Sequence, residues 1–234
     1  YEVVKSVNPK LIYGHITGYG DAGPDANRRA FDVTGWWARS GMMELVRDPG
    51  QVPLLPAPGM GDHSTATALF GAIMSGLYRR ERTGKGCHVS TSLAATGVWA
   101  NGMAIQGVIA GQDLGSRRQK GSWPAPLGDC YRCADDRYIV LAIVNVAREY
   151  PLLCEALDHK DWLQDERFSD IAQAMQQRDL FYDMVCEAFA AQPYAEIAAR
   201  LEHLGVTFAE AQTMADVIDD EQLRANRIIV ETGE

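Results

Sequence analysis

One carboxylate stands in surroundings that suit covalent chemistry. Asp62 follows Gly59-Met60-Gly61 and precedes a run of small residues, which predicts a buried helix from 64 to 80. Free amides and the positive end of a helix dipole keep a carboxylate ionised there, even with little water around it. The flanking glycines let a ligand approach the backbone. Such a carboxylate suits attack on an acyl group, and the same position also suits a purely structural helix N-cap.

The five histidines form no catalytic arrangement in the sequence. His15 falls in an apolar segment, 11–16, that predicts a buried strand, so we expect it to be a satisfied core residue. His63 adjoins Asp62, but neighbouring residues of a helix point in different directions. The others fall near a turn, a loop and a helix end, where we expect them in solvent: His88, His159 and His203. No serine lies in a G-x-S-x-G pattern, and GYGDAG is an incomplete dinucleotide fingerprint.

The cysteines are best interpreted as reduced thiols. Their number, five, is odd, and they are spread along the chain, which is typical of a cytosolic protein. Cys130 and Cys133 form a C-x-x-C pair, but no two further ligands lie at a spacing that completes a zinc site. Their segment predicts a strand, a turn and a strand, so the two thiols should point to different environments. We therefore favour strand thiols over a metal or redox pair and expect no metal ligands.

Composition narrows the class of protein. Hydrophobic residues make up 47% and charged residues 23% of the chain, and the formal net charge is -9. The acidic balance argues against nucleic acid as a partner. No apolar stretch is long enough for a transmembrane helix, and no signal peptide is expected at the start. We expect a cytoplasmic enzyme that is not associated with a membrane.

The residue composition and the predicted elements change once along the chain. Residues 1–115 carry the Asp62 region, a strand at 88–93 and an apolar helix at 94–110. Residues 116–128 are polar and contain Gly and Pro, which indicates a linker. Residues 129–234 predict a small α/β domain: a hairpin within 130–144, then amphipathic helices near 147–157, 172–190 and 194–204. Both ends of the chain resemble cuts through something longer.

Four segments together resemble a known family. In order they read NPKLIYGHITGYGDAGP, FDVTGWWARSGMM, PAPGMGDHSTATALFGAIMSGLYRRERTGKGCHVSTSL and YRCADDRYIVLAI. These resemble successive signatures of the family III (CaiB/BaiF-like) coenzyme A transferases. The most specific is the G-D pair, followed by a small-residue helix and R-x-x-T-G-x-G-x-x-V-x-x-S-L. The match runs through residues 1–145, with looser similarity at DDEQLRANR.

The resemblance implies a fold, a reaction and a site. The fold is α/β, with a Rossmann-like large domain that is only partial in this chain and a small α/β domain, in an interlocked homodimer. The reaction moves coenzyme A between an acyl-CoA and a small carboxylic acid. Asp62 is the implied nucleophile, which forms an aspartyl anhydride and then an aspartyl-CoA thioester, with no metal. No cofactor is tightly bound, since the CoA thioester is a co-substrate. The implied CoA contacts are Arg28, Arg29, Ala30 and Phe31.

The chain departs from the family pattern in ways that leave alternatives open. The family's N-terminal segment and its C-terminal return to the large domain have no counterpart, so the chain alone is expected to aggregate. The loop QKGSWPAPLG offers Gly121 where the formyl-CoA branch is glycine-rich, which argues against formyl-CoA. The stretch WWARSG resembles instead the branch for 2-hydroxyacyl and aryl or branched enoyl acids. An α-methylacyl-CoA racemase needs a histidine where Phe31 stands. A non-catalytic CoA-binding or assembly fragment is the other alternative.

Overall fold

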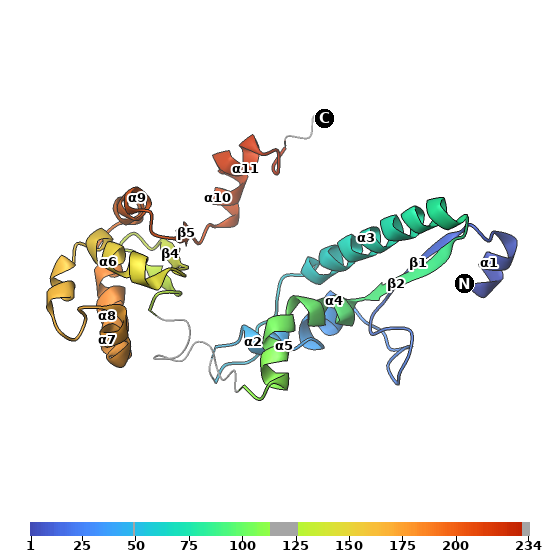
Figure 1. Cartoon of the computed structure of the whole chain (residues 1–234), viewed down its shortest axis with the longest axis horizontal. Coiled ribbons are helices and arrows are strands. Elements are labelled where there is room, and N and C mark those ends of the chain that lie inside the picture. The colour runs from blue at the N-terminus through green and yellow to red at the C-terminus, as the bar shows by residue number, and fades with distance from the viewer. Residues whose placement is uncertain (49, 113–125, 231–234) are drawn as a thin grey trace. The chain divides into compact units, whose positions relative to one another are not determined.

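The structure is a computed structural model that describes residues 1–48, 50–112 and 126–230 (Figure 1). The chain divides into two compact units, Tyr1–Arg118 and Gln119–Glu234, which we call unit 1 and unit 2. Both units combine helices with short strands, so the chain is mixed α/β, as expected. Gly121 and most of the expected linker lie outside the described residues.

Unit 1 is built on two parallel strands and the helix that joins them. β1 (Ile12–Thr17) pairs with β2 (Cys87–Ser92), in register from Ile12↔Cys87 to Thr17↔Ser92. Parallel strands need a crossover connection, and the long helix α3 (Met60–Thr83) supplies it, lying along the strands in Figure 1. The N-terminus of α3 therefore lies at the carboxyl ends of the strands. The remaining elements are α1 (Glu2–Val7), η1 (Asp32–Ala38), α2 (Met42–Leu45), α4 (Leu93–Ala100) and α5 (Gly102–Ile109).

Small residues allow α3 to approach the sheet closely. A Cβ added to Gly76 would lie 3.0 Å from Cys87 Sγ and 3.2 Å from the side chain of Ile12. A Cβ added to Gly14 on β1 would lie 3.1 Å from Ile73 of the helix. The close approach expected from the small residues is confirmed. Burial on every side is not found, because Gly61, Thr65 and Gly76 are the buried residues of this helix.

Two helix boundaries and the burial of one strand in unit 1 differ from the sequence prediction. α3 begins at Met60 instead of 64, so Asp62 lies inside the helix. The single helix expected at 94–110 is two helices that meet at Asn101, whose buried side chain donates to the Ser40 carbonyl at 3.1 Å. β1 is only partly covered among the described residues, and the His15 side chain keeps 41% of its surface exposed. The expectation of a buried core histidine was therefore wrong.

Unit 2 contains the hairpin that the sequence predicts. β3 (Cys130–Arg132) and β4 (Tyr138–Leu141) are antiparallel, and β5 (Phe208–Glu210) adds to the other edge of β4. The helices that share an apolar core with the sheet are α6 (Val146–Ala156), η2 (Lys160–Gln164), α7 (Ile171–Gln176), α8 (Arg178–Ala190) and α9 (Tyr194–Leu204). The helix expected at 172–190 is thus α7 and α8, interrupted at Gln177.

The large apolar cluster of the described chain lies in unit 2, between residues 127 and 206. Tyr131 of β3 stacks on Phe189 of α8 with ring centroids 4.8 Å apart. The two thiols of the C-x-x-C pair do occupy different environments, since Cys130 is exposed and Cys133 is buried. Burial, together with the nearby negative charge of Asp135, raises the pKa of the Cys133 thiol to about 11. A thiol with that pKa stays protonated at neutral pH, which is unfavourable for metal binding.

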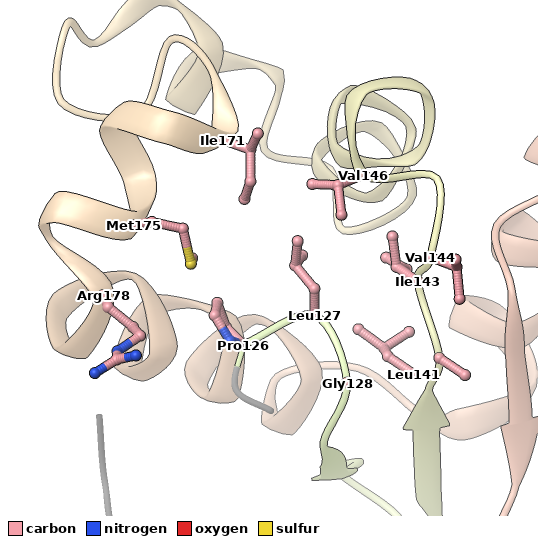
Figure 2. A pocket seen from close by; sticks show the side chains of 11 residues that line it. Pro126, Leu127, Gly128, Leu141, Ile143, Val144, Val146, Ile171, Met175 and Arg178 are labelled. Atoms are coloured by element: carbon pink, nitrogen blue, oxygen red, sulfur yellow. The ribbon is translucent and has the colours of Figure 1, made fainter. Parts of the chain in front are cut away.

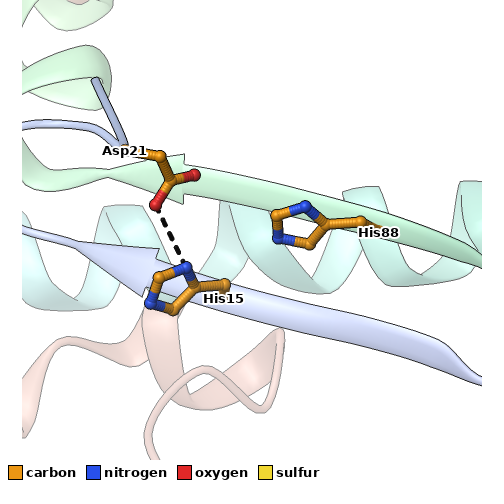
Figure 3. Close-up of side chains that lie close together, drawn as sticks. All are labelled: His15, Asp21 and His88. Carbon is orange, nitrogen blue, oxygen red and sulfur yellow. Dashed lines mark ion pairs between the residues drawn. The ribbon is translucent and has the colours of Figure 1, made fainter. Parts of the chain in front are cut away.

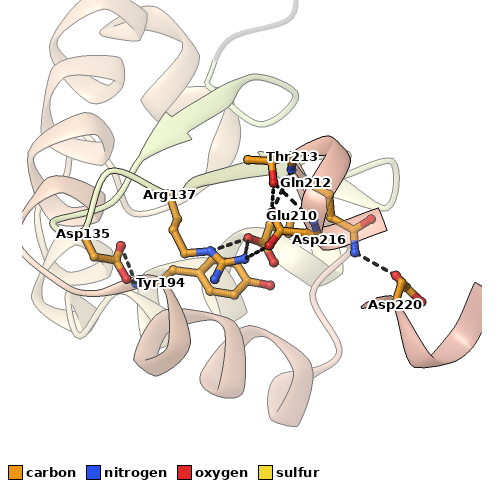
Figure 4. Close-up of polar contacts among 8 residues, drawn as sticks. All are labelled: Asp135, Arg137, Tyr194, Glu210, Gln212, Thr213, Asp216 and Asp220. Carbon is orange, nitrogen blue, oxygen red and sulfur yellow. Dashed lines mark hydrogen bonds and ion pairs between the residues drawn. The ribbon is translucent and has the colours of Figure 1, made fainter. Parts of the chain in front are cut away.

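Polar contacts attach the last two helices, α10 (Met214–Asp219) and α11 (Glu221–Ala225), to the end of the sheet (Figure 4). Arg137, beyond the hairpin turn, pairs with Glu210 of β5 and lies 3.7 Å from Asp216. Asp216 in turn accepts a hydrogen bond from the Thr213 amide at 2.8 Å, which caps α10.

No helix among the described residues is both long enough and apolar enough to cross a membrane.

Candidate active site

A distant carboxylate, Asp32, holds the start of α3. Its side chain accepts the Gly59 amide at 2.6 Å and the Gly61 amide at 2.9 Å. The first amides of a helix have no partner within the helix, so a carboxylate at this end satisfies them and interacts well with the helix dipole. Asp32 is itself buried, and these charge-assisted bonds offset the cost of its burial.

The lack of a side chain at Gly61 allows close packing at the start of α3. A Cβ at this position would lie 2.3 Å from Asp32 Oδ1 and 2.3 Å from Trp36 Cγ. The glycine therefore lets η1 and α3 pack together. Gly59, the residue before the helix, has a φ of +97°, a conformation that favours glycine.

Asp62 is the third residue of α3 and points away from that packing. The helix begins at Met60 after Gly59, and no side-chain cap comes from within the segment, so Asp62 is not the N-cap. Its side chain is exposed in this chain. It still lies in the first turn, at the positive end of the helix dipole. The low-water environment expected around it is not found among the described residues.

The neighbouring elements fix this end of α3 on a second side. The Thr65 hydroxyl donates to the Gly61 carbonyl at 2.6 Å and lies 2.6 Å from the Thr96 hydroxyl of α4. A Cβ at Gly97 of α4 would lie 2.5 Å from the Trp36 carbonyl. Close backbone contacts of this kind leave little freedom, so η1, α3 and α4 together form a rigid support for the first turn of α3.

The expected CoA-contact segment ends at this support. Arg28 is exposed, pairs with Asp25 at 3.6 Å and lies over the Tyr19 ring. Arg29 is also exposed and makes no side-chain hydrogen bond or ion pair among the described residues. A Cβ at Gly18 would lie 2.3 Å from the Ala30 Cβ, so Ala30 rests on the end of β1.

Phe31 leads from this segment directly to Asp32. Its ring is 78% exposed, while its amide donates to the Thr34 hydroxyl at 2.9 Å at the start of η1. Because Asp32 holds Gly61, the residue after Phe31 lies against the residue before Asp62. The structure thus brings two predicted site segments, 28–31 and 59–62, side by side at the carboxyl ends of the strands.

Sequence reasoning missed Asp32, although a signal was present. It is the only acidic residue in the apolar segment between residues 31 and 43, and a buried carboxylate needs several donors to be tolerated. Its partners are 27 and 29 residues away in the sequence, so the pattern alone does not identify them.

Unit 2 has a hollow of its own, shown in Figure 2. The cavity has a volume of about 690 Å³ and is lined mainly by aliphatic side chains: Leu127, Leu141, Ile143, Val146, Ile171 and Met175. Arg178 is the one ionisable residue among those that line it. A lining of this kind can hold an apolar group but contains no nucleophile.

The comparisons with known proteins decide the family. The model of CoA-transferase family III matches residues 1–234. The chain belongs to this family. It is 31% identical over 226 residues to the (R)-2-hydroxy-4-methylpentanoate CoA-transferase of Clostridioides difficile, covering 97% of this chain and 56% of that protein. It is 30% identical over 228 residues to the cinnamoyl-CoA:phenyllactate CoA-transferase of Clostridium sporogenes, covering 97% and 55%.

Solved structures agree with the family assignment. A CaiB/BaiF family protein from Brucella suis matches with a TM-score of 0.79 at 27% identity, over 96% of this chain and 59% of that one. Rv3272 from Mycobacterium tuberculosis matches with a TM-score of 0.82 at 24% identity, over 99% and 60%, which shows a shared fold. The chain thus spans little more than half the length of the curated relatives it matches.

Proposed function

We propose that the protein transfers coenzyme A from an acyl-CoA to a carboxylic acid, with Asp62 as the covalent nucleophile. The observation that carries the proposal is the position of Asp62. It lies in the first turn of α3, which Asp32, Gly61 and Thr65 hold in place. These contacts fix the backbone that carries Asp62, at the positive end of a helix, where a carboxylate nucleophile is well placed.

The proposed reaction exchanges bonds without water or a redox partner. The Asp62 carboxylate attacks the thioester carbonyl of the donor, the C–S bond breaks, and CoA leaves as a thiolate, so that Asp62 and the acyl group form a mixed anhydride. The thiolate attacks the Asp62 carbonyl, which releases the donor acid and leaves an aspartyl-CoA thioester. The acceptor carboxylate then displaces the thiolate to form a second anhydride. Attack of the thiolate on the acceptor's carbonyl gives the new acyl-CoA and frees Asp62.

The segment before η1 is the proposed contact for CoA. Arg28 and Arg29 are exposed cations on a loop that ends beside Asp62, and guanidinium groups suit phosphate oxygens. The backbone at Ala30 and the exposed ring of Phe31 suit the pantetheine arm and the thioester. Phe31 cannot carry a proton, which favours transfer over racemisation at the α-carbon.

We propose acids that carry a 2-hydroxy group or an aryl or branched chain as substrates. The support is similarity: the relatives reported above are named for 2-hydroxy-4-methylpentanoate and for cinnamoyl-CoA with phenyllactate. Acids of this type have a polar carboxyl end and an apolar body. A site for them must combine an ionic contact with aliphatic surface.

The complete site is proposed to need more than the described residues. Asp62 is exposed here, whereas acyl transfer through an anhydride must exclude water. Large apolar side chains of α4 and α5 also face outward, with Trp99 85% and Met103 93% exposed. Surfaces of this kind are typical of protein interfaces. They support the interlocked homodimer that the family resemblance implies.

Substitution of Asp62 tests the proposal in the intact protein. Asp62→Asn keeps the shape and removes the nucleophile, so transfer from an acyl-CoA to 2-hydroxy-4-methylpentanoate should fall by at least about 10³-fold. Asp179→Asn is the matched control, because Asp179 is also an exposed acid in the first turn of a helix. Transfer at the unchanged rate in Asp62→Asn would exclude this residue from the mechanism.

A further inference from the structure

Two histidines meet on the face of the β1–β2 sheet that points away from α3. Ile12 and Cys87 contact the helix, so the alternate residues of each strand lie on the opposite face. The register pairs Tyr13 with His88 and His15 with Ser90. His15 and His88 are therefore diagonal neighbours on one face, and their ring centroids are 6.2 Å apart.

A tight turn brings a carboxylate back over the same face. Gly20 has a φ of +107°, and its amide donates to the Thr17 hydroxyl at 3.0 Å, so the chain reverses directly after β1. Asp21 then lies beside His15, with 3.2 Å between Oδ1 and Nδ1. Figure 3 shows the three side chains, which come from two strands and one turn.

We propose that His15, Asp21 and His88 bind a divalent transition-metal ion of the zinc type. One ligand atom from each of the three residues lies within 4.8 Å of the others. Bonds of about 2.0–2.2 Å in a tetrahedral site put ligand atoms about 3.3 Å apart, so the exposed side chains need only small rotations. Two imidazole nitrogens and one carboxylate oxygen form a ligand set of intermediate hardness. Such a set suits Zn²⁺, Co²⁺ or Ni²⁺ better than Ca²⁺ or Mg²⁺, which prefer oxygen ligands.

The surroundings favour a bound ion over a simple ion pair. Both partners of the His15–Asp21 pair are well exposed, with 41% and 47% of their side-chain surface free, and exposed pairs stabilise little. Tyr1 stacks on His88 and Tyr13 lies against both rings, so the aromatic neighbours restrain the imidazoles.

The ion would have a structural role that is separate from CoA transfer. It would join β1, β2 and the loop after β1, and this loop continues to Asp32 at the start of η1. Cys87 faces α3 and cannot join the site, so three protein ligands leave a position for water. None of the three residues belongs to the segments proposed to contact CoA or the acyl group.

Calorimetric titration of the intact, chelator-treated protein with ZnCl₂ tests the inference. We expect one saturable ion per chain, and visible absorption bands when CoCl₂ replaces zinc. His15→Ala and His88→Ala should each weaken binding at least tenfold. Asp21→Asn should do the same with little risk to folding, because the residue is exposed and similar in size.

His159→Ala is the matched control. His159 also lies near an aspartate, with 3.5 Å between its Nδ1 and Asp161 Oδ1, but among the described residues it belongs to no group of three possible metal ligands. It should leave zinc binding unchanged. No saturable binding by the unmodified protein would overturn the inference. So would unchanged binding in His15→Ala, His88→Ala and Asp21→Asn, or an equal loss in His159→Ala, which would indicate non-specific coordination by histidines.

Discussion

Removal of the Asp32 carboxylate should loosen the first turn of α3 and displace Asp62. Asp32→Ala eliminates two hydrogen bonds, at 2.6 and 2.9 Å, from the only side chain seen to cap this helix among the described residues. Hydrogen bonds to a charged group contribute about 1.5–3 kcal/mol each. The variant recovers the cost of burying the charge, so we expect a local loss of about 2–5 kcal/mol.

Hydrogen exchange measures this loss where it occurs. At about tenfold per 1.4 kcal/mol, the amides at the start of α3 should exchange at least about 30-fold faster in Asp32→Ala. Asp32→Asn keeps one acceptor oxygen and should lie between this variant and the unmodified protein. The rate of CoA transfer should decrease in the same order, from the unmodified protein to Asp32→Asn to Asp32→Ala, because a misplaced Asp62 reacts slowly.

A matched control separates this effect from ordinary cap removal. Asp170 caps α7 with one hydrogen bond to the Gln173 amide at 2.9 Å, and its loss should cost about 0.5–2 kcal/mol in unit 2 alone. Two results would refute this account. One is that Asp32→Ala accelerates exchange at the start of α3 no more than Asp170→Ala accelerates it at the start of α7. The other is that Asp32→Ala leaves CoA transfer intact.

Three further predictions follow from the packing. Gly61→Ala should destabilise unit 1 by about 1–3 kcal/mol through overpacking and change tryptophan fluorescence; an unaltered spectrum and melting temperature would contradict the contact with η1. Iodoacetamide at pH 7.5 should modify exposed Cys130 well before Cys133, whose thiol has a pKa of about 11, and equal rates by peptide mass would be inconsistent with burial. Glutamate at Trp99 and Met103 should lower the mass of the intact protein in light scattering, whereas an unchanged mass would place the subunit interface elsewhere.

Periodic local patterns predicted many of the elements correctly. The alternation in β2 and in the hairpin of unit 2, with a turn at 134–136, defines strands because successive side chains point to opposite faces. The small residues of α3 indicated close packing against a neighbour, and Gly76 against Cys87 confirms it. Family signatures in the same segments predicted Asp62 as the nucleophile, and this assignment stays a prediction.

Features that depend on distant contacts were not predictable in this way. The residue at which α3 begins depends on hydrogen bonds to Asp32, which is remote in the sequence. The break between α4 and α5 at Asn101 depends on a hydrogen bond to the Ser40 carbonyl, 61 residues away. The exposure of His15 depends on what covers the sheet, which its own strand pattern does not specify. Its proximity to His88 becomes visible only when the strand register is known.

Covalent capture of Asp62 is the most direct test of the proposed function. Hydroxylamine attacks anhydrides and thioesters but leaves a resting carboxylate unchanged. Treatment of the intact protein with an acyl-CoA and hydroxylamine should therefore convert Asp62 to a hydroxamate, seen by peptide mass as activity is lost. Substrate recovered from deuterated water should retain its α-hydrogen. Exchange of that hydrogen without any modification of Asp62 would contradict CoA transfer through this residue and indicate a racemase instead.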